Sequence, residues 1–225
     1  MSPTVILATR SAGKLRELTA LCAALNTPVL TLDDAKIAVS PEEDALEDFD
    51  TFEANALAKA RWFHARRPDS IVIADDSGLT VDALHGDPGV RSKRWSGRVD
   101  LEDAALDAAN NAQLQRRLDG AAREGRISRR AQYVCAAAFI WATGEYAVRA
   151  ETHGVILRSP VGVGGFGYDP YFLSDDLGAT FAEVGRAEKA AVSHRGRAFT
   201  RLLDELQRLG AIDLCRAVDP RSSSG

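Results

Sequence analysis

The chain has 225 residues, of which 45% are hydrophobic and 27% are charged, and its formal net charge is −4. At roughly 100 to 200 residues per domain, this length allows one large domain or two lobes around a buried core. The composition lies near the average for soluble globular proteins, which excludes disordered and fibrous classes for the body of the chain. The mildly acidic balance argues against a nucleic-acid or membrane partner, because both are bound through clustered positive charge.

The apolar runs are short, and the cysteines are scattered. A run such as Tyr133 to Ala142 falls well below the roughly 20 residues that a membrane-spanning helix needs, and Met1 leads directly into a strand-like segment. We therefore expect a cytoplasmic protein without a signal peptide. Cys22, Cys135 and Cys215 are odd in number and lack the spacing of a metal site, so we expect reduced core thiols.

The N-terminal part of the chain has the pattern of an α/β unit. TVILA is a short β-branched run, TRSAG is a turn that contains glycine, and KLRELTALCAALN carries apolar residues at helical spacing. A second short strand is expected near Val29 to Leu32. The acidic stretch PEEDALEDFD then leads into a helix from about Asp50 to Arg66, which Asp50 or Thr51 can cap.

The segment IVIADDSGLTVDAL predicts a buried strand, an acidic turn that contains glycine, and a second strand with alternating apolar residues. Asp75 and Asp76 are then expected at a strand end, which is where α/β sheets bind ligands. A loop rich in Gly and Arg follows. After it we expect a helix from about Leu101 to Leu118 and a polar, Arg-rich connection through Ser128.

The C-terminal third predicts a hairpin, a flexible loop and a long helix. Strands over Tyr133 to Thr143 and Glu145 to Leu157 are expected to meet at a tight Thr143-Gly144 turn. The loop SPVGVGGFGYDPYF has too many glycines for a strand and suits close approach of backbone to a ligand. The helix that follows Ser193 is expected to end at Gly210, with a core face made of Ala198, Leu202, Leu203, Leu206 and Leu209.

Three groups of residues can carry chemistry. The first lies between the first strand and the first helix, where free N–H groups and the helix dipole favour an anion. Hydroxyl and ammonium donors add to it, so this turn predicts a phosphate site made of Thr9, Arg10, Ser11, Gly13 and Lys14. The spacing is not that of a P-loop, and a simple capped turn is the alternative interpretation.

The second group is acidic. Asp75 and Asp76 are adjacent, and Glu47 lies in the preceding acidic loop. Carboxylate oxygens suit Mg²⁺, which would relieve the repulsion between neighbouring carboxylates and leave one of them free to take a proton from water. The alternative is a solvated acidic turn, which the buried IVIA strand before it disfavours.

The third group could hold a planar heterocycle. Phe166, Tyr168 and Asp169 offer an aromatic face and a carboxylate acceptor within the glycine-rich loop. Lys189, His194 and Arg195 offer donors that can read acceptor atoms on a base edge. A histidine at a helix start is often only a surface cap, which is the alternative for His194.

Together the three groups describe a nucleotide enzyme, and they resemble a known family. The strings ILATRSAGKLRELTALC, TFEANALAKA, ADDSGLTVDALHGDPGVRSKRWSG, GVGGFGYDPYF and AEKAAVSHRGRA are similar to those of the inosine/xanthosine triphosphate pyrophosphatase family, also called the RdgB/HAM1 family. The resemblance runs in order from about Val5 to Leu209. Five ordered motifs over most of the chain are far more specific than any one of them.

The resemblance implies a role for each matching residue. The triphosphate would be bound by Thr9, Arg10, Ser11, Ala12, Gly13 and Lys14, with Lys59 assisting. Mg²⁺ would be held by Glu47, Asp75 and Asp76, while Asp76 also accepts the proton of the attacking water and Ser77 contacts the substrate. The purine would be held and read by Phe166, Gly167, Tyr168, Asp169, Lys189, His194 and Arg195.

The sequence departs from the family pattern at Ser11 and Lys93. Ser11 stands where relatives often have Asn, although a hydroxyl can replace an amide there. Lys93 lies where many bacterial relatives have Ala, and it is either an extra phosphate contact or a surface lysine. Glu47 is chosen among several acidic neighbours by its spacing of four residues before Thr51.

The resemblance also implies a fold and an activity. The fold would be α/β, a central mixed β-sheet flanked by helices with two lobes around a deep nucleotide cleft, in a single domain over residues 1–216 with a flexible tail over 217–225. The protein would be a homodimer and would cleave ITP, dITP or XTP to the monophosphate and pyrophosphate with Mg²⁺, cleaning the nucleotide pool. The alternatives are a pyrophosphatase for modified pyrimidine or methylated nucleotides and a nucleotide-binding sensor without hydrolysis.

Overall fold

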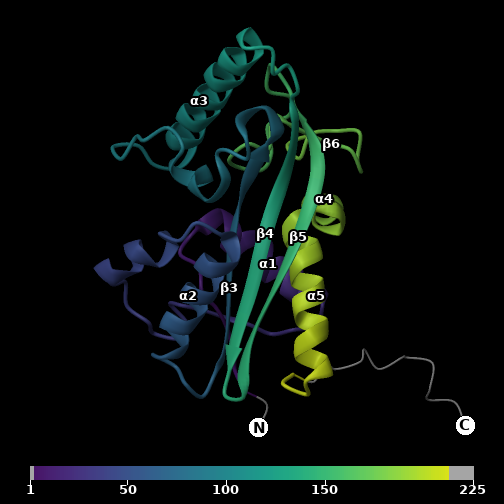
Figure 1. Cartoon of the computed structure of the whole chain (residues 1–225). Coiled ribbons are helices and arrows are strands. Elements are labelled where there is room, and N and C mark those ends of the chain that lie inside the picture. The colour runs from purple at the N-terminus through teal and green to yellow at the C-terminus, as the bar shows by residue number, and fades with distance from the viewer. Residues whose placement is uncertain (1–2, 213–225) are drawn as a thin grey trace, which may run out of the picture.

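The structure is a computed structural model that describes residues 3–212. Its centre is one six-stranded sheet with the strand order β2-β1-β3-β4-β5-β6 (Figure 1). The first three strands pair in parallel, and β3 to β6 pair antiparallel. Their bounds are Val5–Leu7 (β1), Leu30–Thr31 (β2), Ile71–Val81 (β3), Arg130–Trp141 (β4), Gly144–Ile156 (β5) and Phe172–Ser174 (β6). The expected mixed sheet is confirmed, and the expected deep cleft between two lobes stays a prediction.

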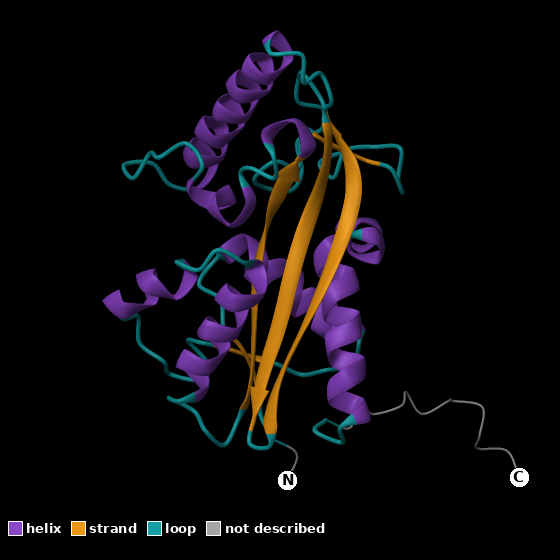
Figure 2. Cartoon of the chain, in the orientation of Figure 1, coloured by secondary structure: helices purple, strands orange, loops and turns teal. Residues whose placement is uncertain are grey.

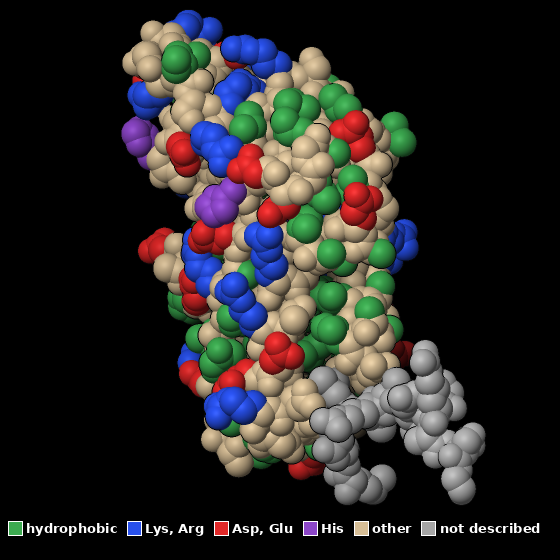
Figure 3. All heavy atoms as spheres, turned by 90° about the vertical axis from the view of Figure 1, so that its right-hand side faces the viewer, with side chains coloured by type: hydrophobic (Ala, Val, Ile, Leu, Met, Phe, Trp, Pro, Cys, Tyr) green, Lys and Arg blue, Asp and Glu red, His purple; other side chains and the backbone are tan. Residues whose placement is uncertain are grey.

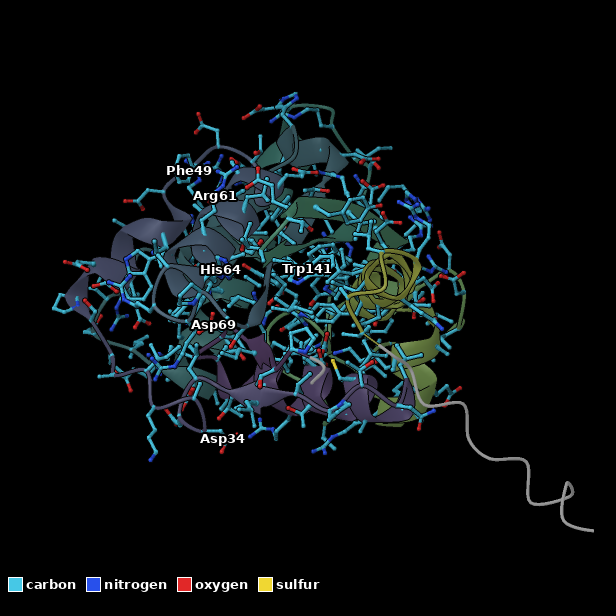
Figure 4. All side chains as sticks on the ribbon, turned by 90° about the horizontal axis from the view of Figure 1, so that it is seen from below. Asp34, Phe49, Arg61, His64, Asp69 and Trp141 are labelled. Carbon is cyan, nitrogen blue, oxygen red and sulfur yellow. The ribbon has the colours of Figure 1, made fainter. Side chains whose placement is uncertain are left out.

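Five α-helices flank this sheet in the described residues (Figure 2). They are α1 (Ala12–Ala24), α2 (Phe52–His64), α3 (Asp103–Arg123), α4 (Arg186–Val192) and α5 (His194–Arg208), joined by short 3₁₀ helices η1 (Pro41–Glu47), η2 (Asp82–Leu84) and η3 (Gly89–Arg94). Seen from below, α2 and α5 lie on opposite sides of the strand end that carries Trp141 (Figure 4). Helix α3 lies at the other end of the long strands (Figure 1).

The alternation of side chains along β3 explains these layers. Ile71 and Ile73 pack with α1 and α5 on one face, whereas Val72 and Ala74 pack with α2 on the other. Farther along the same strand, Leu79 joins a third core that α3 closes. Because both faces are covered, most of β3 is buried, and the polar residues in its middle are carried into the interior.

The face that carries β5, β6, α4 and α5 is shown in Figure 3. Hydrophobic side chains gather toward its upper part, and acidic and basic side chains mix across its middle. None of the helices in residues 3–212 is long and apolar enough to cross a membrane.

The helix starts are set by side chains that cap them. Ser11, Thr51 and Ser193 each accept a hydrogen bond from a backbone N–H in the first turn of α1, α2 and α5. Thr51 is therefore the cap of the helix expected from about Asp50.

Cys22 and Cys135 are free and buried as expected, and burial raises the pKa of each thiol to about 12. Cys215 and the expected tail lie outside the described residues.

The expected turn inside IVIADDSGLTVDAL is wrong, because β3 runs through it without a break. Strand β4 pairs with it from Val72 to Val81, and this continuous ladder keeps the acidic residues extended. Gly78 does not mark a turn there. A Cβ at Gly78 would lie 2.4 Å from both the Gly89 carbonyl oxygen and Ser92 Oγ, so the glycine serves the close approach of η3.

We expect Gly78→Ala to destabilise the protein. The added methyl group meets backbone at a position with no free space, and overpacking of this kind costs roughly 1 to 3 kcal/mol of unfolding free energy. Urea unfolding measures the loss. Gly144→Ala is the matched control, because no atom of the described residues outside its chain neighbours lies within 4 Å of a Cβ at that position. Equal midpoints for the two variants would contradict the close approach.

Other boundaries also differ from expectation. The hairpin turns one residue earlier, since Trp141 pairs with Gly144, and α3 continues past Leu118 to Arg123. Leu209 is wrong as a core residue, because α5 ends at Arg208 and Leu209 is 41% exposed. The short elements β6 and α4 are missing from the sequence prediction, since three and seven residues carry too little periodicity.

Candidate active site

The turn between β1 and α1 places a lysine over the middle of the sheet. Ser11 Oγ accepts the Lys14 N–H at 3.4 Å, and Thr9 Oγ1 accepts the Ser11 N–H at 3.3 Å, so both hydroxyls shape the turn. Ala12 and Gly13 begin α1, where backbone N–H groups have no partner within the helix. The turn thus combines a helix N-terminus with the ammonium group of Lys14.

The guanidinium of Arg10 points elsewhere. It binds Glu43, contacts Asp33 at 3.3 Å, and donates to the Ile37 and Ala38 carbonyl oxygens at 3.0 and 3.1 Å. Arg10 therefore ties the β1–α1 turn to the segment before and within η1. The structure does not bring its side chain to the carboxylates of β3.

Two lysines meet at the open edge of β3. The parallel ladder with β1 ends when Ala8 N–H donates to the Ile73 carbonyl oxygen at 2.7 Å. Beyond that point the Asp75 carbonyl oxygen accepts from Lys59 Nζ at 2.9 Å and from Lys14 Nζ at 3.5 Å. The end of β1 thus frees a stretch of β3 to which α1 and α2 each contribute an ammonium group.

The adjacent carboxylates of Asp75 and Asp76 have different environments. Asp75 lies on the face of α1 and α5, where Lys14 Nζ is 3.0 Å and Arg195 Nε 3.6 Å from Oδ2, and Ser77 Oγ donates to the same oxygen at 2.6 Å. Burial would raise the pKa of Asp75, but these cations outweigh it and hold the pKa well below its usual range. Asp75 is therefore a fixed anion.

Asp76 lies on the other face of the strand, under α2. Asn55 Nδ2 donates to its Oδ2 at 2.8 Å, and the Ser77 N–H donates to its Oδ1 at 2.9 Å. Burial raises the pKa of Asp76. The positive charge of Lys14 lowers this pKa, and the negative charge of Glu47 raises it. One carboxylate is thus held ionised while its neighbour becomes more basic, which is the separation that a general base needs.

Glu47 ends η1, and its carboxylate forms an ion pair with Lys59. A cavity of about 630 Å³ opens beside it, between residues 47–50 and residues 85–91. Arg94 of η3 reaches across to the Glu47 carbonyl oxygen at 3.3 Å. In residues 3–212 no three acidic, His or Cys side chains converge as a metal-ligand set. The buried Asp75 Oδ1 nevertheless has no hydrogen-bond partner within this range, which leaves one hard oxygen for a cation.

A second charged cluster joins α1, α4 and α5. Lys189 Nζ of α4 contacts Glu17 Oε1 and Asp169 Oδ2, each at 2.6 Å, and Arg195 Nη1 contacts Glu17 Oε2 at 2.8 Å. Burial would raise the pKa of Glu17, but Arg195 and Lys189 outweigh it and lower the pKa. Arg195 also faces Asp75, so this residue links the cluster to the carboxylates of β3.

Phe166 lies between this cluster and α1. Lys189 Nζ and the Arg195 guanidinium carbon are both 5.2 Å from its ring centroid. Its ring atoms would be 3.1 to 3.2 Å from a Cβ at Gly13, so the glycine at the start of α1 allows the contact. The aromatic face of the glycine-rich loop therefore meets the β1–α1 turn directly.

His194 and Tyr168 are buried. The His194 ring stacks on Tyr133 with centroids 4.6 Å apart, and neither of its ring nitrogens has a partner among the described residues. Burial lowers the pKa of His194 well below its usual value, so the ring is neutral. Tyr168 packs in the core under α3, and its hydroxyl donates to the Ser92 carbonyl oxygen at 2.8 Å. His194 is thus not a surface cap.

Three residues that were not predicted from the sequence contact the predicted ones: Glu17, Asn55 and Tyr133. Glu17 follows Lys14 by three residues, so it lies on the same side of α1, and this spacing was a usable signal. Asn55 is fully buried on α2, where helical periodicity places it between Thr51 and Lys59. Nothing in the sequence marks Tyr133, because an aromatic residue in a strand is ordinary core.

The site has two adjoining parts. In one, ammonium groups lie beside buried carboxylates at a helix N-terminus, and in the other an aromatic ring lies 5.2 Å from two cations. Such a site suits a phosphorylated heterocycle. The chain belongs to the Ham1 family, whose model matches residues 5–205. A dITP/XTP pyrophosphatase of Geobacter sulfurreducens is 45% identical over 90% of this chain and 96% of its own length. A dITP/XTP pyrophosphatase of Mycolicibacterium paratuberculosis is 47% identical over 93% of this chain and 98% of its own length.

Solved structures agree with this assignment. A HAM1 protein from Coxiella burnetii has a TM-score of 0.75 and 31% identity, covering 92% of this chain and 99% of that chain. The Ham1 protein of Staphylococcus aureus has a TM-score of 0.73 and 29% identity, with the same coverage. The expected family is therefore confirmed over most of the chain.

Proposed function

We propose that this protein is a nucleoside triphosphate pyrophosphohydrolase that converts ITP, dITP and XTP to the monophosphate and pyrophosphate. The observation that carries the proposal is the continuous chain of charged contacts from Lys14 through Asp75, Arg195 and Glu17 to Lys189. It joins the start of α1, which suits an anion, to the cluster of Phe166, Lys189 and Arg195, which suits a base. Relatives that cover almost the whole chain are named dITP/XTP pyrophosphatases, which supports the same activity.

Asp76 is the proposed acceptor of the proton from the attacking water. Its raised pKa makes it a better base than Asp75, and Asn55 and Ser77 fix its orientation through both oxygens. Lys14 and Lys59 offset the negative charge of the leaving pyrophosphate, since phosphoryl transfer is mainly a matter of positioning and electrostatics.

Mg²⁺ is the proposed cofactor, held by Glu47, Asp75 and Asp76. These residues supply hard carboxylate oxygens, and Asp75 Oδ1 has no hydrogen-bond partner among the described residues. Binding by all three would require the Asp75 carboxylate, which faces α1 and α5, to turn toward the side of β3 on which Asp76 lies. When bound, Mg²⁺ would neutralise charge on the phosphates and lower the pKa of a bound water. Binding would require Lys59 to release Glu47, with which it is now paired.

The base preference follows from donors in the second cluster. Lys189 uses two of its three N–H groups on Glu17 and Asp169, so one remains for a ligand. A carbonyl at the purine 6-position, as in inosine and xanthine, accepts from such a donor, whereas the amino group of adenine opposes it. We therefore propose discrimination against ATP at this point.

One assay tests the proposed function. Pyrophosphate release is measured from ITP, dITP, XTP, ATP, and a set of modified pyrimidine and methylated triphosphates, with Mg²⁺ and again with EDTA. We expect pyrophosphate release from ITP, dITP and XTP when Mg²⁺ is present and no release from them with EDTA. Preference for modified pyrimidines would favour the alternative pyrophosphatase, and binding of ITP without release would favour the sensor.

Lys14→Ala should raise the Michaelis constant for ITP about ten-fold or more and weaken IMP binding much less. Its ammonium lies at the β1–α1 turn, and one charged contact contributes roughly 1.5 to 3 kcal/mol. Steady-state kinetics and calorimetry with IMP measure the two effects. Lys36→Ala, at an exposed position, is the control. Melting temperatures show whether loss of the ion pair between Lys14 and Asp75 destabilises the fold. Equal weakening of ITP and IMP would remove Lys14 from the phosphate site.

Three further proposals concern the whole protein. We propose that it works as a cytoplasmic homodimer and that residues 1–216 form one domain. Support for the homodimer comes from the family resemblance, and size-exclusion chromatography with light scattering tests it. Lys93 is exposed. The kinetic measurement described for Lys14 also distinguishes a phosphate contact from a surface lysine at this position.

A further inference from the structure

Gly167 lies within the glycine-rich loop, residues 159–172, that precedes and enters β6. Its φ of +64° is in the left-handed region, which favours glycine. The residue before it is Phe166, whose ring centroid lies 5.2 Å from both Lys189 Nζ and the Arg195 guanidinium carbon, and Asp169 follows two residues later. The position of the Gly167 peptide groups therefore sets where the aromatic ring lies.

Helix α3 holds both polar groups of Gly167. The Gly167 N–H donates to Asp107 Oδ2 at 2.6 Å, and the Gly167 carbonyl oxygen accepts from Asn111 Nδ2 at 2.9 Å. The two side chains are four residues apart on one helix face, so they bind the two consecutive peptide groups that flank the Gly167 Cα. Asn111 Nδ2 also donates to the Asp107 backbone carbonyl oxygen at 2.9 Å, which fixes its amide in this orientation.

The neighbouring peptide is held from the other side. The Phe166 N–H donates to Asp169 Oδ2 at 2.9 Å, and the same oxygen contacts Lys189 Nζ. Phe166 thus has a fixed peptide on each side, one tied to α3 and one tied to the cation cluster. Without the contacts of α3, only the Asp169 side would hold the ring against Gly13.

We propose that Asp107 and Asn111 are positioning residues that set the base preference of the site by holding Gly167 and, through it, the ring of Phe166. The inference rests on the proposed function, because it takes the base to lie against Phe166. Neither side chain needs to touch the substrate. Both act from α3, which packs with Leu79 and Val81 at the end of β3, whereas Lys14 and Lys59 meet Asp75 in the middle of the strand.

Three variants separate positioning from folding. Asn111→Asp keeps the shape but replaces the donor with an acceptor facing the Gly167 carbonyl oxygen. Asp107→Ala removes the acceptor, and Asp107→Asn keeps an acceptor oxygen and should restore function. Asp119→Ala is the matched control, since Asp119 is an exposed carboxylate on the same helix. Melting temperatures are measured for every variant, and Asp107→Ala decides the outcome if Asn111→Asp does not fold.

The readout is kcat/KM for ITP and for ATP, with inhibition by inorganic tripolyphosphate beside it. We expect Asn111→Asp and Asp107→Ala to lower kcat/KM for ITP about ten-fold, mainly through KM, and to reduce the ITP/ATP ratio. Tripolyphosphate inhibition should not change, because the lysines of the phosphate site belong to α1 and α2. In a Phe166→Ala background the two substitutions should have no further effect on the ratio.

Two failures are distinguishable. A wild-type protein without activity on ITP would overturn the proposed function and the inference with it. A wild-type protein active on ITP, with Asn111→Asp and Asp107→Ala variants that keep its ITP/ATP ratio, would overturn the inference alone. So would variants that lose the ratio equally with and without Phe166, because the effect would then not pass through the ring.

Discussion

Asp76→Asn should abolish most of the turnover while the protein stays folded. An amide does not accept the proton of the attacking water, and it does not neutralise a cation, so we expect a loss on the order of 10² to 10⁴ in kcat. Both Asp76 oxygens accept hydrogen bonds, from Asn55 Nδ2 and from the Ser77 N–H. The new NH₂ group would therefore face a donor, and we also expect a small drop in melting temperature.

The exchange of Asn55 and Asp76 separates the two effects. In the double variant Asn55→Asp, Asp76→Asn, the donor and acceptor are swapped, and the bond between the two side chains can form again. Asn55 Oδ1 accepts a hydrogen bond from the Phe49 N–H, and the carboxylate introduced by Asn55→Asp would still accept it. We expect the melting temperature to recover and the turnover to stay low. Near wild-type pyrophosphate release from the single variant at saturating Mg²⁺ would refute the role of Asp76.

Much of the fold follows from local patterns. Capping residues mark the starts of α1, α2 and α5, and the apolar spacing of α5 gives its buried face as far as Leu206. The failures have a common cause. Whether DDSG is a turn or a strand depends on the ten-residue ladder that β4 provides, and that partner lies some sixty residues away in the sequence.

The sequence indicated which residues could carry chemistry, but it did not indicate how their side chains are arranged. Adjacent carboxylates on a continuous strand point to opposite faces, so Asp75 meets α1 and α5 while Asp76 meets α2. A turn would have placed them together. Likewise the contact of Phe166 with Gly13 joins segments more than 150 residues apart, and no local signal encodes that contact.

Lys189→Met should narrow the preference for ITP over ATP by roughly 10- to 150-fold. Methionine keeps an unbranched side chain that is one atom shorter and removes the donor, so inosine loses a partner and the amino group of adenine no longer faces a buried N–H group. This range corresponds to roughly 1 to 3 kcal/mol for one charged hydrogen bond. The substitution leaves Glu17 with Arg195 and leaves Asp169 with the Phe166 N–H and the Tyr133 hydroxyl, so the pocket keeps its frame.

The measurement is the ratio of kcat/KM for ITP and ATP in the wild type and in Lys189→Met. Lys36→Met, an exposed lysine changed in the same way, is the control for nonspecific loss, and both variants are compared at equal folded fraction. Lys14→Ala should weaken ITP and ATP to a similar degree, because both carry the same triphosphate. If Lys189→Met also lowers both substrates by one common factor, Lys189 supports the structure or the phosphates, and the base is read by another group.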